Sequence, residues 1–511
     1  MSLAKQEPPS AGSGSRAPQA PAREPSARAL RYREHRIPRR HRVFVNRNLR
    51  LSTIRAIGFD LDHTLAHYDP VPVERLAFEL TKKKLVEKKG YPEQIRDLQY
   101  DPEFVVRGLV VDKKRGNCLK MDYFNYVSRG VHGLSPLRSE ERNRAYRTSR
   151  VRVGHENYVS VDTLFHLPEV YLYLSGVELL ERGRGVPLAD YTGLYEDVRA
   201  MIDEAHADGS LKSVITAGLD SYVRVDQELR TVLEEFRRSG KKLFLLTNSD
   251  WRYADTLLQY ILARGRAAPE HWSEVFDFIV VDARKPFFYQ NGDTPVPVPE
   301  PRERGLKTPV MSGGSASYLE RAVGAAGEHV LYFGDHTYGD ILQSKKLMGW
   351  RTAMLVPELD REIQVTQEHA KEFERLGRLS AERHHIEIEK AAIGREFRRM
   401  MLMLEEHGTD GPDTPRHQDL AARLQAVPGE IGALDQRAAE LLTEIESLRA
   451  RLDRAYNVHW GSLFREGNES SRFGHQLKDF ACVYTSRVTN FLHYPWNYYF
   501  QSPVSYMPHD F

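Results

Sequence analysis

The sequence predicts an α/β fold built on a parallel central sheet, with a module inserted after the first strand and a helical hairpin near the C-terminus. Three observations support this prediction. Short apolar segments that suit buried parallel strands recur along the chain and end in polar residues. A long stretch, residues 72–215, separates the first of these segments from the second. Residues 359–457 are highly charged and carry apolar residues at helical and heptad spacing.

Size and composition indicate a soluble globular protein with more than one domain. The chain has 511 residues, of which 41% are hydrophobic, and its 73 basic and 71 acidic side chains give a net charge of +2. This balance gives no argument for nucleic acid or a membrane as partner. Because the sequence lacks an apolar run of about 18 residues and an apolar leader, we expect a cytoplasmic protein. Its two cysteines, Cys118 and Cys482, lie far apart and are expected to be reduced.

The first 42 residues are predicted to form a disordered, basic arm. Residues 1–28 are rich in Pro, Ala, Ser, Gly and Arg and cannot bury a core. Residues 31–42 are strongly basic. They are either a patch for an anionic partner or a solvated arm that leads into the fold, and we favour the second interpretation. The folded part is predicted to begin at residue 43.

The first predicted strand, residues 54–59, is followed by two carboxylates, Asp60 and Asp62, with Thr64 behind them. Open parallel sheets place their chemistry at this carboxyl edge. The spacing of two residues allows one carboxylate to act as a nucleophile and the other as a proton donor. The same pattern also occurs in surface turns and calcium loops, so the interpretation depends on partners further along the chain.

The insert, residues 72–215, is predicted to be a lid that covers the site and selects the substrate. Two alternating segments flank residues 113–117 and predict a β-hairpin with Gly116 and Asn117 in its turn. The predicted helices of the insert span residues 74–89, 162–176 and 188–209.

One helix of the insert carries a polar stripe. Arg199, Asp203 and His206 fall at positions i, i+4 and i+7 and therefore share one face. An apolar face lies beside them. The stripe could line a polar pocket, although spacing alone favours an ordinary solvated face.

A second apolar strand, residues 241–246, follows an amphipathic helix at residues 225–237. It ends in Thr247 and Asn248, small polar residues that suit a phosphate, and a helix N-terminus behind them would add backbone N–H donors. Simple capping of that helix by Asn or Ser is an equally open alternative. Residues 350–356 are predicted to be a further strand.

Two other strands are predicted between these. Residues 276–281 are followed by Lys285, which could hold a phosphoryl oxygen as a point charge, although a lysine in a loop is ordinary. Residues 329–334 lead into Asp335, and Asp340 lies five residues further on. Carboxylates clustered with those of the first loop would suit Mg²⁺, which prefers oxygen ligands.

The C-terminal part combines helices with an aromatic tail. Residues 359–457 are predicted to form an antiparallel coiled-coil-like hairpin with a loop at residues 408–415, and Pro428 is expected to kink or break its second helix. The hairpin could pack within the chain or make a homo-oligomer contact. Residues 458–511 are aromatic-rich and are expected to pack on the core, whereas the Pro- and Gly-rich residues 291–312 are predicted to be a surface excursion.

The order and types of the residues at the four strand ends resemble the haloacid-dehalogenase (HAD) superfamily of phosphatases. The closer resemblance is to the cytosolic purine 5′-nucleotidases within it, over residues 40–511. It implies a HAD-like Rossmannoid core of residues 43–71 and 216–358, with residues 72–215 as the cap. The motifs that carry the resemblance are Phe59-Asp-Leu-Asp-His-Thr-Leu-Ala, Arg107-Gly-Leu-Val-Val-Asp, Leu164-Phe-His-Leu-Pro-Glu, Gly209-Ser-Leu-Lys, Thr247-Asn-Ser-Asp, Asp282-Ala-Arg-Lys-Pro, Gly334-Asp-His-Thr-Tyr-Gly-Asp-Ile-Leu, Gly349-Trp-Arg-Thr, Gly461-Ser-Leu-Phe-Arg and Tyr494-Pro-Trp-Asn-Tyr.

The resemblance implies a phosphatase mechanism. Asp60 would attack phosphorus and form an aspartyl-phosphate, while Asp62 would protonate the leaving ribose oxygen and then deprotonate the hydrolytic water. Thr247 and Lys285 would hold the phosphoryl oxygens, with Asn248 beside them. The implied ligands of Mg²⁺ are Asp60, the backbone carbonyl of Asp62, Asp335 and Asp340. Members of the family can also transfer the phosphoryl group to a nucleoside.

The resemblance also implies a pocket for a purine nucleoside 5′-monophosphate such as IMP or GMP. Phe165 would stack on the base, and Arg199 and Asp203 would bond base edges or ribose. There are two departures: His166 stands where the eukaryotic enzymes carry Asn, and Ala207 replaces a Tyr. The implied pocket residues are Phe165, His166, Arg199, Asp203, His206 and Lys212.

Two rival functions remain open at this point. The chain could be a HAD phosphatase that acts on another phosphomonoester. It could instead be a scaffold of the same fold that acts through the basic arm and the helical hairpin. The complete set of acidic, hydroxyl and lysine residues at the strand ends argues against an inactive enzyme.

Overall fold

Strand β3 (Ala56–Phe59) consists of four residues that are buried on both faces, and it lies near the middle of the central sheet. It pairs in parallel with β15 (Val330–Gly334) on one side and with β11 (Lys242–Leu246) on the other. The computed structural model describes residues 37–147, 151–184, 189–263, 271–290, 292–406 and 415–504.

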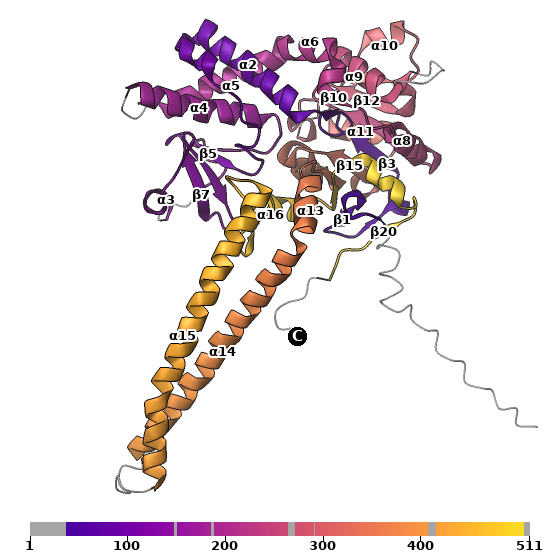
Figure 1. The fold of residues 1–511 in the computed structure, drawn as a ribbon. Helices are drawn as coiled ribbons and strands as arrows, with labels where there is room; N and C mark the ends of the chain where they lie inside the picture. Colours follow the sequence, from indigo (N-terminus) through magenta and orange to yellow (C-terminus); the bar gives the residue numbers. More distant parts are fainter. Residues whose placement is uncertain are drawn as a thin grey trace, which may run out of the picture. The chain divides into compact units, whose positions relative to one another are not determined.

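The central sheet has nine strands among the described residues (Figure 1). Neighbours from β19 to β14 pair in parallel, whereas β1 and β13 pair antiparallel at the two edges. The predicted α/β class with a mainly parallel sheet is therefore confirmed. In spatial order the strands are β1 (Phe44–Val45), β19 (Val483–Thr485), β16 (Arg351–Leu355), β15, β3, β11, β12 (Phe278–Val281), β14 (Val310–Ser312) and β13 (Val296–Pro297).

Aromatic side chains cover both faces of this sheet. Phe59 and Phe333 stack with ring centroids 5.0 Å apart, and Phe244 and Tyr332 stack at 6.3 Å. A Cβ on Gly58 would lie only 2.1 Å from Cε2 of Phe244, so β3 requires glycine where this ring crosses it. The helices between the strands are α8 (Leu229–Arg238), α9 (Trp251–Ala263), α10 (Pro299–Glu303), α11 (Ala316–Val323) and α12 (Gln343–Met348).

The predicted surface excursion at residues 291–312 needs a correction at two short strands. Within this segment β13 and β14 extend the central sheet, and β14 pairs in parallel with β12. Val310 of β14 is buried opposite Ile279, so its apolar side chain outweighs the Pro- and Gly-rich composition around it. Composition averaged over the segment concealed one short apolar strand.

The aromatic tail also adds to the sheet. Its strand β19 pairs in parallel with β16 and antiparallel with β1, which joins residues near both ends of the described chain. Strand β20 (Tyr499–Phe500) pairs with β2 (Leu49–Arg50), and η8 (Val488–His493) lies between β19 and β20 in sequence.

The insert forms its own sheet and helices. It begins and ends at β4 (His67–Tyr68) and β10 (Val223–Arg224), which pair antiparallel, so the two connections to the core lie side by side. The assignment of the insert as a cap stays a prediction. Its antiparallel sheet has the order β8 (Ser135–Pro136), β7 (Val127–His132), β6 (Asn117–Met121), β5 (Val110–Asp112) and β9 (Tyr158–Ser160). Its helices are α2 (Pro70–Lys89), α3 (Ser139–Tyr146), α4 (His166–Arg184), α5 (Tyr191–Ala207), α6 (Ser210–Ala217) and α7 (Leu219–Tyr222).

The predicted hairpin of the insert is confirmed, with one correction to its turn. Strands β5 and β6 pair antiparallel, and Gly116 adopts a φ of +68° that suits glycine. Asn117 is not in the turn but begins β6, where it pairs with Asp112. Its side chain donates a hydrogen bond to the hydroxyl of Tyr146, which fixes it in the strand.

Helices α14 (Ala370–Glu406) and α15 (Pro415–Tyr456) run side by side as the predicted C-terminal helix pair (Figure 1). Ile386 of α14 packs with Ala438 and Leu441 of α15, so the apolar heptad positions are used within the chain. Arg361 of α13 (Leu359–Glu368) donates to the carbonyl of Ala455 near the base of the pair.

Pro428 does not break the second helix, because α15 continues through it, and the alternative of a kink stays a prediction. Pro428 is exposed, and water can therefore satisfy the carbonyl that loses its helical partner. Residues 407–414, most of the predicted loop at 408–415, lie outside the described residues. The same holds for residues 1–36 of the predicted basic arm.

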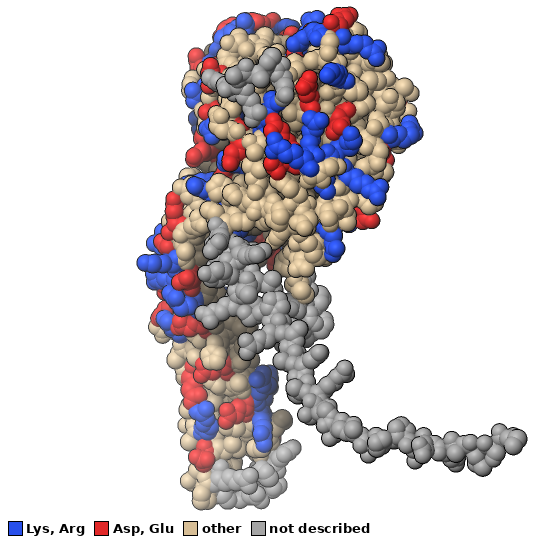
Figure 2. Space-filling view, turned by 90° about the vertical axis from the view of Figure 1, so that its right-hand side faces the viewer, with Lys and Arg blue, Asp and Glu red and all other residues tan. Residues whose placement is uncertain are grey.

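Charged side chains of both signs alternate along the visible face of the helix pair (Figure 2). Arg437 lies 2.6 Å from Glu382, and Lys390 lies 2.5 Å from Asp435. Exposed pairs of this kind contribute little to stability, because water screens them. The apolar positions between the helices, rather than these pairs, therefore hold α14 and α15 together. Across the described residues, no helix has both the length and the apolar character needed to cross a membrane.

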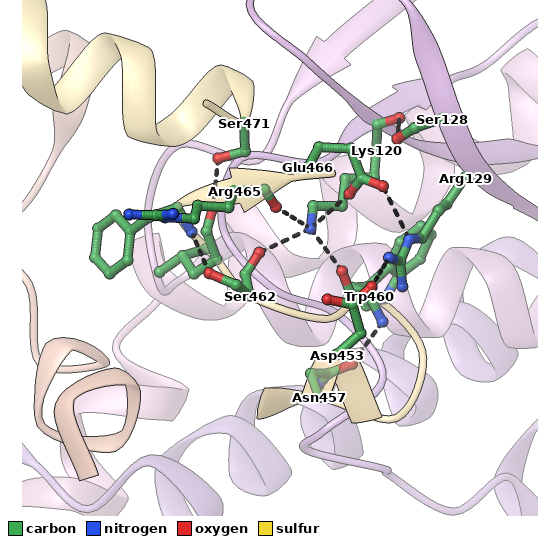
Figure 3. Close-up of polar contacts among 12 residues, drawn as sticks. Lys120, Ser128, Arg129, Asp453, Asn457, Trp460, Ser462, Arg465, Glu466 and Ser471 are labelled. Atoms are coloured by element: carbon green, nitrogen blue, oxygen red, sulfur yellow. Dashed lines mark hydrogen bonds and ion pairs between the residues drawn. The ribbon is translucent and has the colours of Figure 1, made fainter. Parts of the chain in front are cut away.

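A buried lysine joins the insert to the segment that follows α15. Figure 3 shows the ammonium of Lys120, on β6, among backbone carbonyls of this segment. It donates to the carbonyls of Trp460 (2.6 Å), Ser462 (2.7 Å) and Arg465 (2.9 Å), and it lies 2.9 Å from the carboxylate of Glu466. One charged group therefore satisfies several polar groups that are removed from water.

Replacing Lys120 with Met should lower the free energy of unfolding by about 3–5 kcal/mol, because the variant leaves three backbone carbonyls without their donor and leaves the carboxylate of Glu466 paired with Arg129 alone. Urea denaturation measures the change. Lys83→Met, at an exposed position of α2, is the matched control and should change stability by less than about 0.5 kcal/mol. Equal stability of the two variants would contradict this account of Lys120.

Candidate active site

Four strands of the central sheet bring polar side chains to the same edge. Asp60 follows β3, Thr247 follows β11 and Asp335 follows β15 directly, and Lys285 lies in the loop after β12. These strands run in parallel, so their carboxyl ends meet. The structure therefore brings together residues that are up to 275 positions apart in the sequence.

The ammonium of Lys285 lies between two carboxylates. It donates to Oδ1 of Asp60 at 2.8 Å and to Oδ1 of Asp340 at 2.6 Å, and it also reaches the hydroxyl of Tyr332 at 3.0 Å. Tyr332 in turn donates to the carbonyl of Leu246 at the end of β11. The lysine is thereby fixed in a buried position beside Asp60.

Burial dominates the electrostatics of this group. It raises the pKa of Asp60 to about 7, because desolvation outweighs the attraction of Lys285, and the carboxylates of Asp340 and Asp62 add to the rise. Burial, with Asp340 and Asp60 nearby, also holds the pKa of Asp335 well above its usual range. Although burial lowers the pKa of Lys285, the carboxylates of Asp340 and Asp60 outweigh it and keep the ammonium charged.

Asp335 and Asp340 are positioned by their backbone surroundings. A Cβ on Gly334 would lie 2.4 Å from Cβ of Asp340, so glycine at this position permits Asp340 to approach the end of β15. Arg107 of the insert donates to the carbonyl of Asp335 at 2.9 Å. The same guanidinium binds both oxygens of Glu358, at 2.7 and 2.6 Å.

Asp60, Asp335 and Asp340 fit a divalent cation. Each offers one carboxylate oxygen, these oxygens lie within 4.8 Å of one another, and all three residues are buried. Oδ2 of Asp335 is buried without a hydrogen-bond partner. Two of the three carboxylates, those of Asp60 and Asp340, contact the ammonium of Lys285, and a divalent ion would balance the remaining negative charge. The backbone carbonyl of Asp62, as a further ligand, stays a prediction.

Asp62 is held by hydroxyl groups rather than by a cation. Tyr68 donates to Oδ1 at 2.5 Å, and Ser249 donates to Oδ2 at 2.9 Å. Thr247 is fully buried, and its hydroxyl accepts the backbone N–H of Ser249 at 3.0 Å. Ser249, but not Thr247, lines the cavity above the carboxylates.

Asn248 fixes the loop that carries Lys285. Its Oδ1 accepts the backbone N–H of Lys285 at 2.7 Å, and its Nδ2 donates to the carbonyl of the same residue at 3.2 Å. The β11 and β12 loops are therefore bonded to each other directly. The predicted contact of Asn248 with a phosphate stays a prediction.

A cavity of about 510 Å³ opens above the carboxylates, between the core and the insert. This volume suits a ligand of nucleotide size. The polar stripe of α5 faces this cavity, so it is not an ordinary solvated face. The predicted site residues that line it are Asp60, Asp62, Phe165, His166, Arg199, Asp203, His206, Lys212, Asn248, Lys285, Asp335 and Asp340.

Arg199 is held by three neighbours. It donates to Oε2 of Glu169 at 2.8 Å, to Oδ2 of Asp203 at 2.9 Å and to Nε2 of His166 at 3.0 Å. Glu169 is 1% exposed and also accepts a hydrogen bond from Tyr195. The orientation of Arg199 is therefore set before any ligand enters.

Phe165 and Lys212 lie at other points of the wall. The ring of Phe165 meets His63 edge-on, with centroids 4.6 Å apart, and it meets His206 edge-on at 5.5 Å. Lys212 pairs with Asp250 at 2.8 Å. The predicted roles of Phe165 in stacking and of Lys212 in binding stay predictions.

Sequence reasoning missed several residues of the site. Glu169 lies three positions after His166 on α4, and this helical spacing could have revealed it. Ser249 lies inside a motif that was already identified. No sequence signal indicated Tyr68, Tyr253 or Tyr332, because their hydroxyls meet the site only through the tertiary fold.

Comparison with known proteins identifies relatives over nearly the whole chain. A model described as "5' nucleotidase family" matches residues 43–511. The chain is 30% identical over 484 residues to a 5′-nucleotidase domain-containing protein of Dictyostelium discoideum, covering 92% of this chain and 75% of that protein. It is 28% identical over 492 residues to 5′-nucleotidase domain-containing protein 2 of Rattus norvegicus, covering 92% and 80%. A solved structure of a "predicted phosphoglycolate phosphatase" from Haemophilus somnus 129PT matches 60% of this chain and 86% of its own chain, with 14% identity and a TM-score of 0.27. This identity and this TM-score are too low to support a functional argument.

His63 should make the fold sensitive to acid. Burial lowers its pKa to about 3, and Arg107 and His67 add to this effect, whereas the unfolded chain protonates this side chain near pH 6.5. The free energy of unfolding therefore falls as pH falls from 6.5 towards 3. His63 should account for about 2 kcal/mol of the difference in this free energy between pH 7 and pH 5. Urea unfolding at the two pH values measures the loss.

The variant His63→Gln should remove this part of the difference between pH 7 and pH 5. His384→Gln, at an exposed position of α14, is the control and should leave the difference unchanged. If His63→Gln keeps the full difference of the unchanged protein, the imidazole is not the source of the sensitivity.

Proposed function

Because the chain belongs to the 5′ nucleotidase family, we propose that it hydrolyses purine nucleoside 5′-monophosphates to nucleoside and phosphate with the help of Mg²⁺. The observation that carries this proposal is the buried Lys285 between Asp60 and Asp340, at the floor of a cavity of nucleotide size. A carboxylate beside a fixed ammonium suits phosphoryl transfer, because the ammonium stabilises charge on the transferring group.

In the proposed reaction Asp60 is the nucleophile. Its carboxylate oxygen forms a bond to phosphorus, and the bond from phosphorus to the ribose oxygen breaks. Asp62 gives its proton to that oxygen and later takes a proton from the water that cleaves the aspartyl-phosphate. Lys285 and the residues at the end of β11, Thr247 and Asn248, hold the phosphoryl oxygens. If a nucleoside rather than water attacks the aspartyl-phosphate, the phosphoryl group passes to the nucleoside and the protein acts as a phosphotransferase.

The cation would be held by Asp60, Asp335 and Asp340, with the backbone carbonyl of Asp62. We propose Mg²⁺ because every available ligand is a hard oxygen atom. When bound, it neutralises negative charge on the phosphoryl group and on the carboxylates. The two carboxylates nearest Lys285 then need not repel the incoming phosphate.

The insert supplies the proposed base and ribose contacts. Arg199 is presented to the cavity by Glu169, and Asp203 beside it offers a hydrogen-bond acceptor. Phe165, His166, His206 and Lys212 form the rest of the proposed binding surface. A mixed donor and acceptor surface of this kind favours the polar edges of a purine over a plain phosphomonoester.

Asp60→Asn should lower phosphate release from a purine nucleoside 5′-monophosphate on the order of 10⁴-fold or more, because the amide cannot form the covalent intermediate. Phosphate release with Mg²⁺ from IMP, GMP, AMP, CMP, UMP and several sugar phosphates measures both activity and preference. Chelation by EDTA should abolish turnover, and added Mg²⁺ should restore it. Turnover by Asp60→Asn at the rate of the unchanged protein would exclude the aspartyl-phosphate mechanism.

The same panel separates the rival functions. Preference for IMP or GMP supports the purine pocket, whereas broad activity without base preference would keep the chemistry and reject the pocket. Absence of activity with every substrate would favour the scaffold function instead.

Arg199→Ala should raise KM for a purine nucleoside 5′-monophosphate about 10- to 100-fold, because it removes charged hydrogen bonds to the substrate. KM for p-nitrophenyl phosphate, which lacks base and ribose, should change less than about 3-fold. Steady-state kinetics on both substrates measures this contrast. Equal effects on the two substrates would show that Arg199 does not select the base.

A further inference from the structure

Asp62 is contacted by a chain of two tyrosine hydroxyls. Tyr68 lies 2.5 Å from Oδ1 of Asp62, and the hydroxyl of Tyr253 lies 2.7 Å from that of Tyr68. Oδ2 of Asp62 accepts a separate hydrogen bond from Ser249. Both tyrosines are only 6% exposed, so their hydroxyl groups depend on one another and on Asp62 for hydrogen bonds.

The two tyrosines belong to well-anchored elements. Tyr68 is on β4, paired with Val223 of β10, and its ring meets His63 edge-on at 5.1 Å. Tyr253 is on α9, and the ammonium of Lys212 lies 5.0 Å from the centre of its ring. The hydroxyl chain therefore has a fixed geometry at Asp62, built from the insert connection and from the core.

This inference rests on the proposed reaction. In that reaction Asp62 must carry a proton in the first half-reaction and must lack it in the second half-reaction. A fixed donor such as an ammonium would oppose the protonated state. A hydroxyl can donate or accept. When Asp62 is a carboxylate, Tyr68 donates to it and accepts from Tyr253. When Asp62 carries the proton on Oδ1, that proton can be donated to Tyr68, which then donates to Tyr253.

We propose that Tyr68 and Tyr253 form a reversible hydrogen-bond chain that positions Asp62 for both proton transfers. Both tyrosines are positioning residues that act through Asp62. In the first half-reaction the bond from phosphorus to the ribose oxygen breaks and the proton of Asp62 moves to that oxygen. In the second half-reaction water forms its bond to phosphorus, the bond to Asp60 breaks and a proton of the water returns to Asp62. No net proton is gained or lost by the tyrosines.

The structure gives the two tyrosines unequal importance. Only Tyr68 touches Asp62, and Tyr253 reaches Asp62 through Tyr68. Removing the hydroxyl of Tyr253 should therefore matter only while that of Tyr68 is present. Two groups that acted independently would instead have multiplying effects.

The test uses Tyr68→Phe, Tyr253→Phe and the double variant of the full chain. Activity is measured as kcat/KM on IMP and on p-nitrophenyl phosphate. This parameter covers the steps up to departure of the leaving group, and p-nitrophenolate leaves readily without a proton, whereas a ribose oxygen needs one. Tyr146→Phe is the matched control, because its hydroxyl is also buried and bonds a carboxylate, Asp112, but lies within the insert.

Tyr68→Phe should lower kcat/KM on IMP about 10- to 100-fold and on p-nitrophenyl phosphate by less than about 3-fold, with KM for IMP nearly unchanged. Tyr253→Phe should show a smaller loss with the same preference for IMP. The double variant should match Tyr68→Phe, and Tyr146→Phe should match the unchanged protein. Tyr253→Phe also serves as the test if Tyr68→Phe does not fold.

Three results would overturn the inference. They are equal losses on both substrates, no loss with either substrate, and a double variant whose loss is the product of the two single losses. An unchanged protein that hydrolyses p-nitrophenyl phosphate but not IMP, or neither, would refute the proposed function itself. Turnover of IMP together with any of the three results would refute the positioning role alone.

Discussion

The contact between Lys285 and two carboxylates is the constraint around which the site is built. Three carboxylates of the cluster are buried with one ammonium, an arrangement that costs free energy unless each group is held in place. Parallel strands provide that rigidity, because β3, β12 and β15 fix the backbone on which Asp60, Lys285 and Asp335 depend. The aromatic faces of the sheet, including the close approach of Phe244 to Gly58, stabilise the same strands.

The insert takes part in the site through charged groups as well as through its cavity wall. Arg107 supports the backbone of Asp335 and binds Glu358, and Glu169 holds Arg199. The guanidinium groups of Arg107 and Arg199 are therefore oriented by protein partners before a ligand binds. Precise binding requires side chains that are oriented in advance in this way. Lys120 joins the insert to the segment after α15, so buried charged groups of the insert bond both to the end of β15 and to this segment.

Much of the fold and the floor of the site could be predicted from the sequence, because apolar strands that end in Asp60, Lys285 and Asp335 indicate a parallel sheet whose edge collects them. The wall of the site was harder to predict. Tyr68 and Tyr253 meet through hydroxyl groups 185 positions apart, a contact set by the packing of β4 beside α9 and by no periodicity. At Pro428 the sequence allowed a kink or a break, and the break does not occur, because solvent can satisfy the carbonyl that proline leaves unpaired.

The position of β19 beside β16 and β1 has a consequence for how the protein is made. A ribosome releases residues 351–355 and then the entire helix pair before it releases residues 483–485. During that interval β16 presents a bare strand edge to the cell, and such edges pair readily with other chains. Until residues 483–485 emerge, the core therefore lacks the strand that covers this edge in the folded protein.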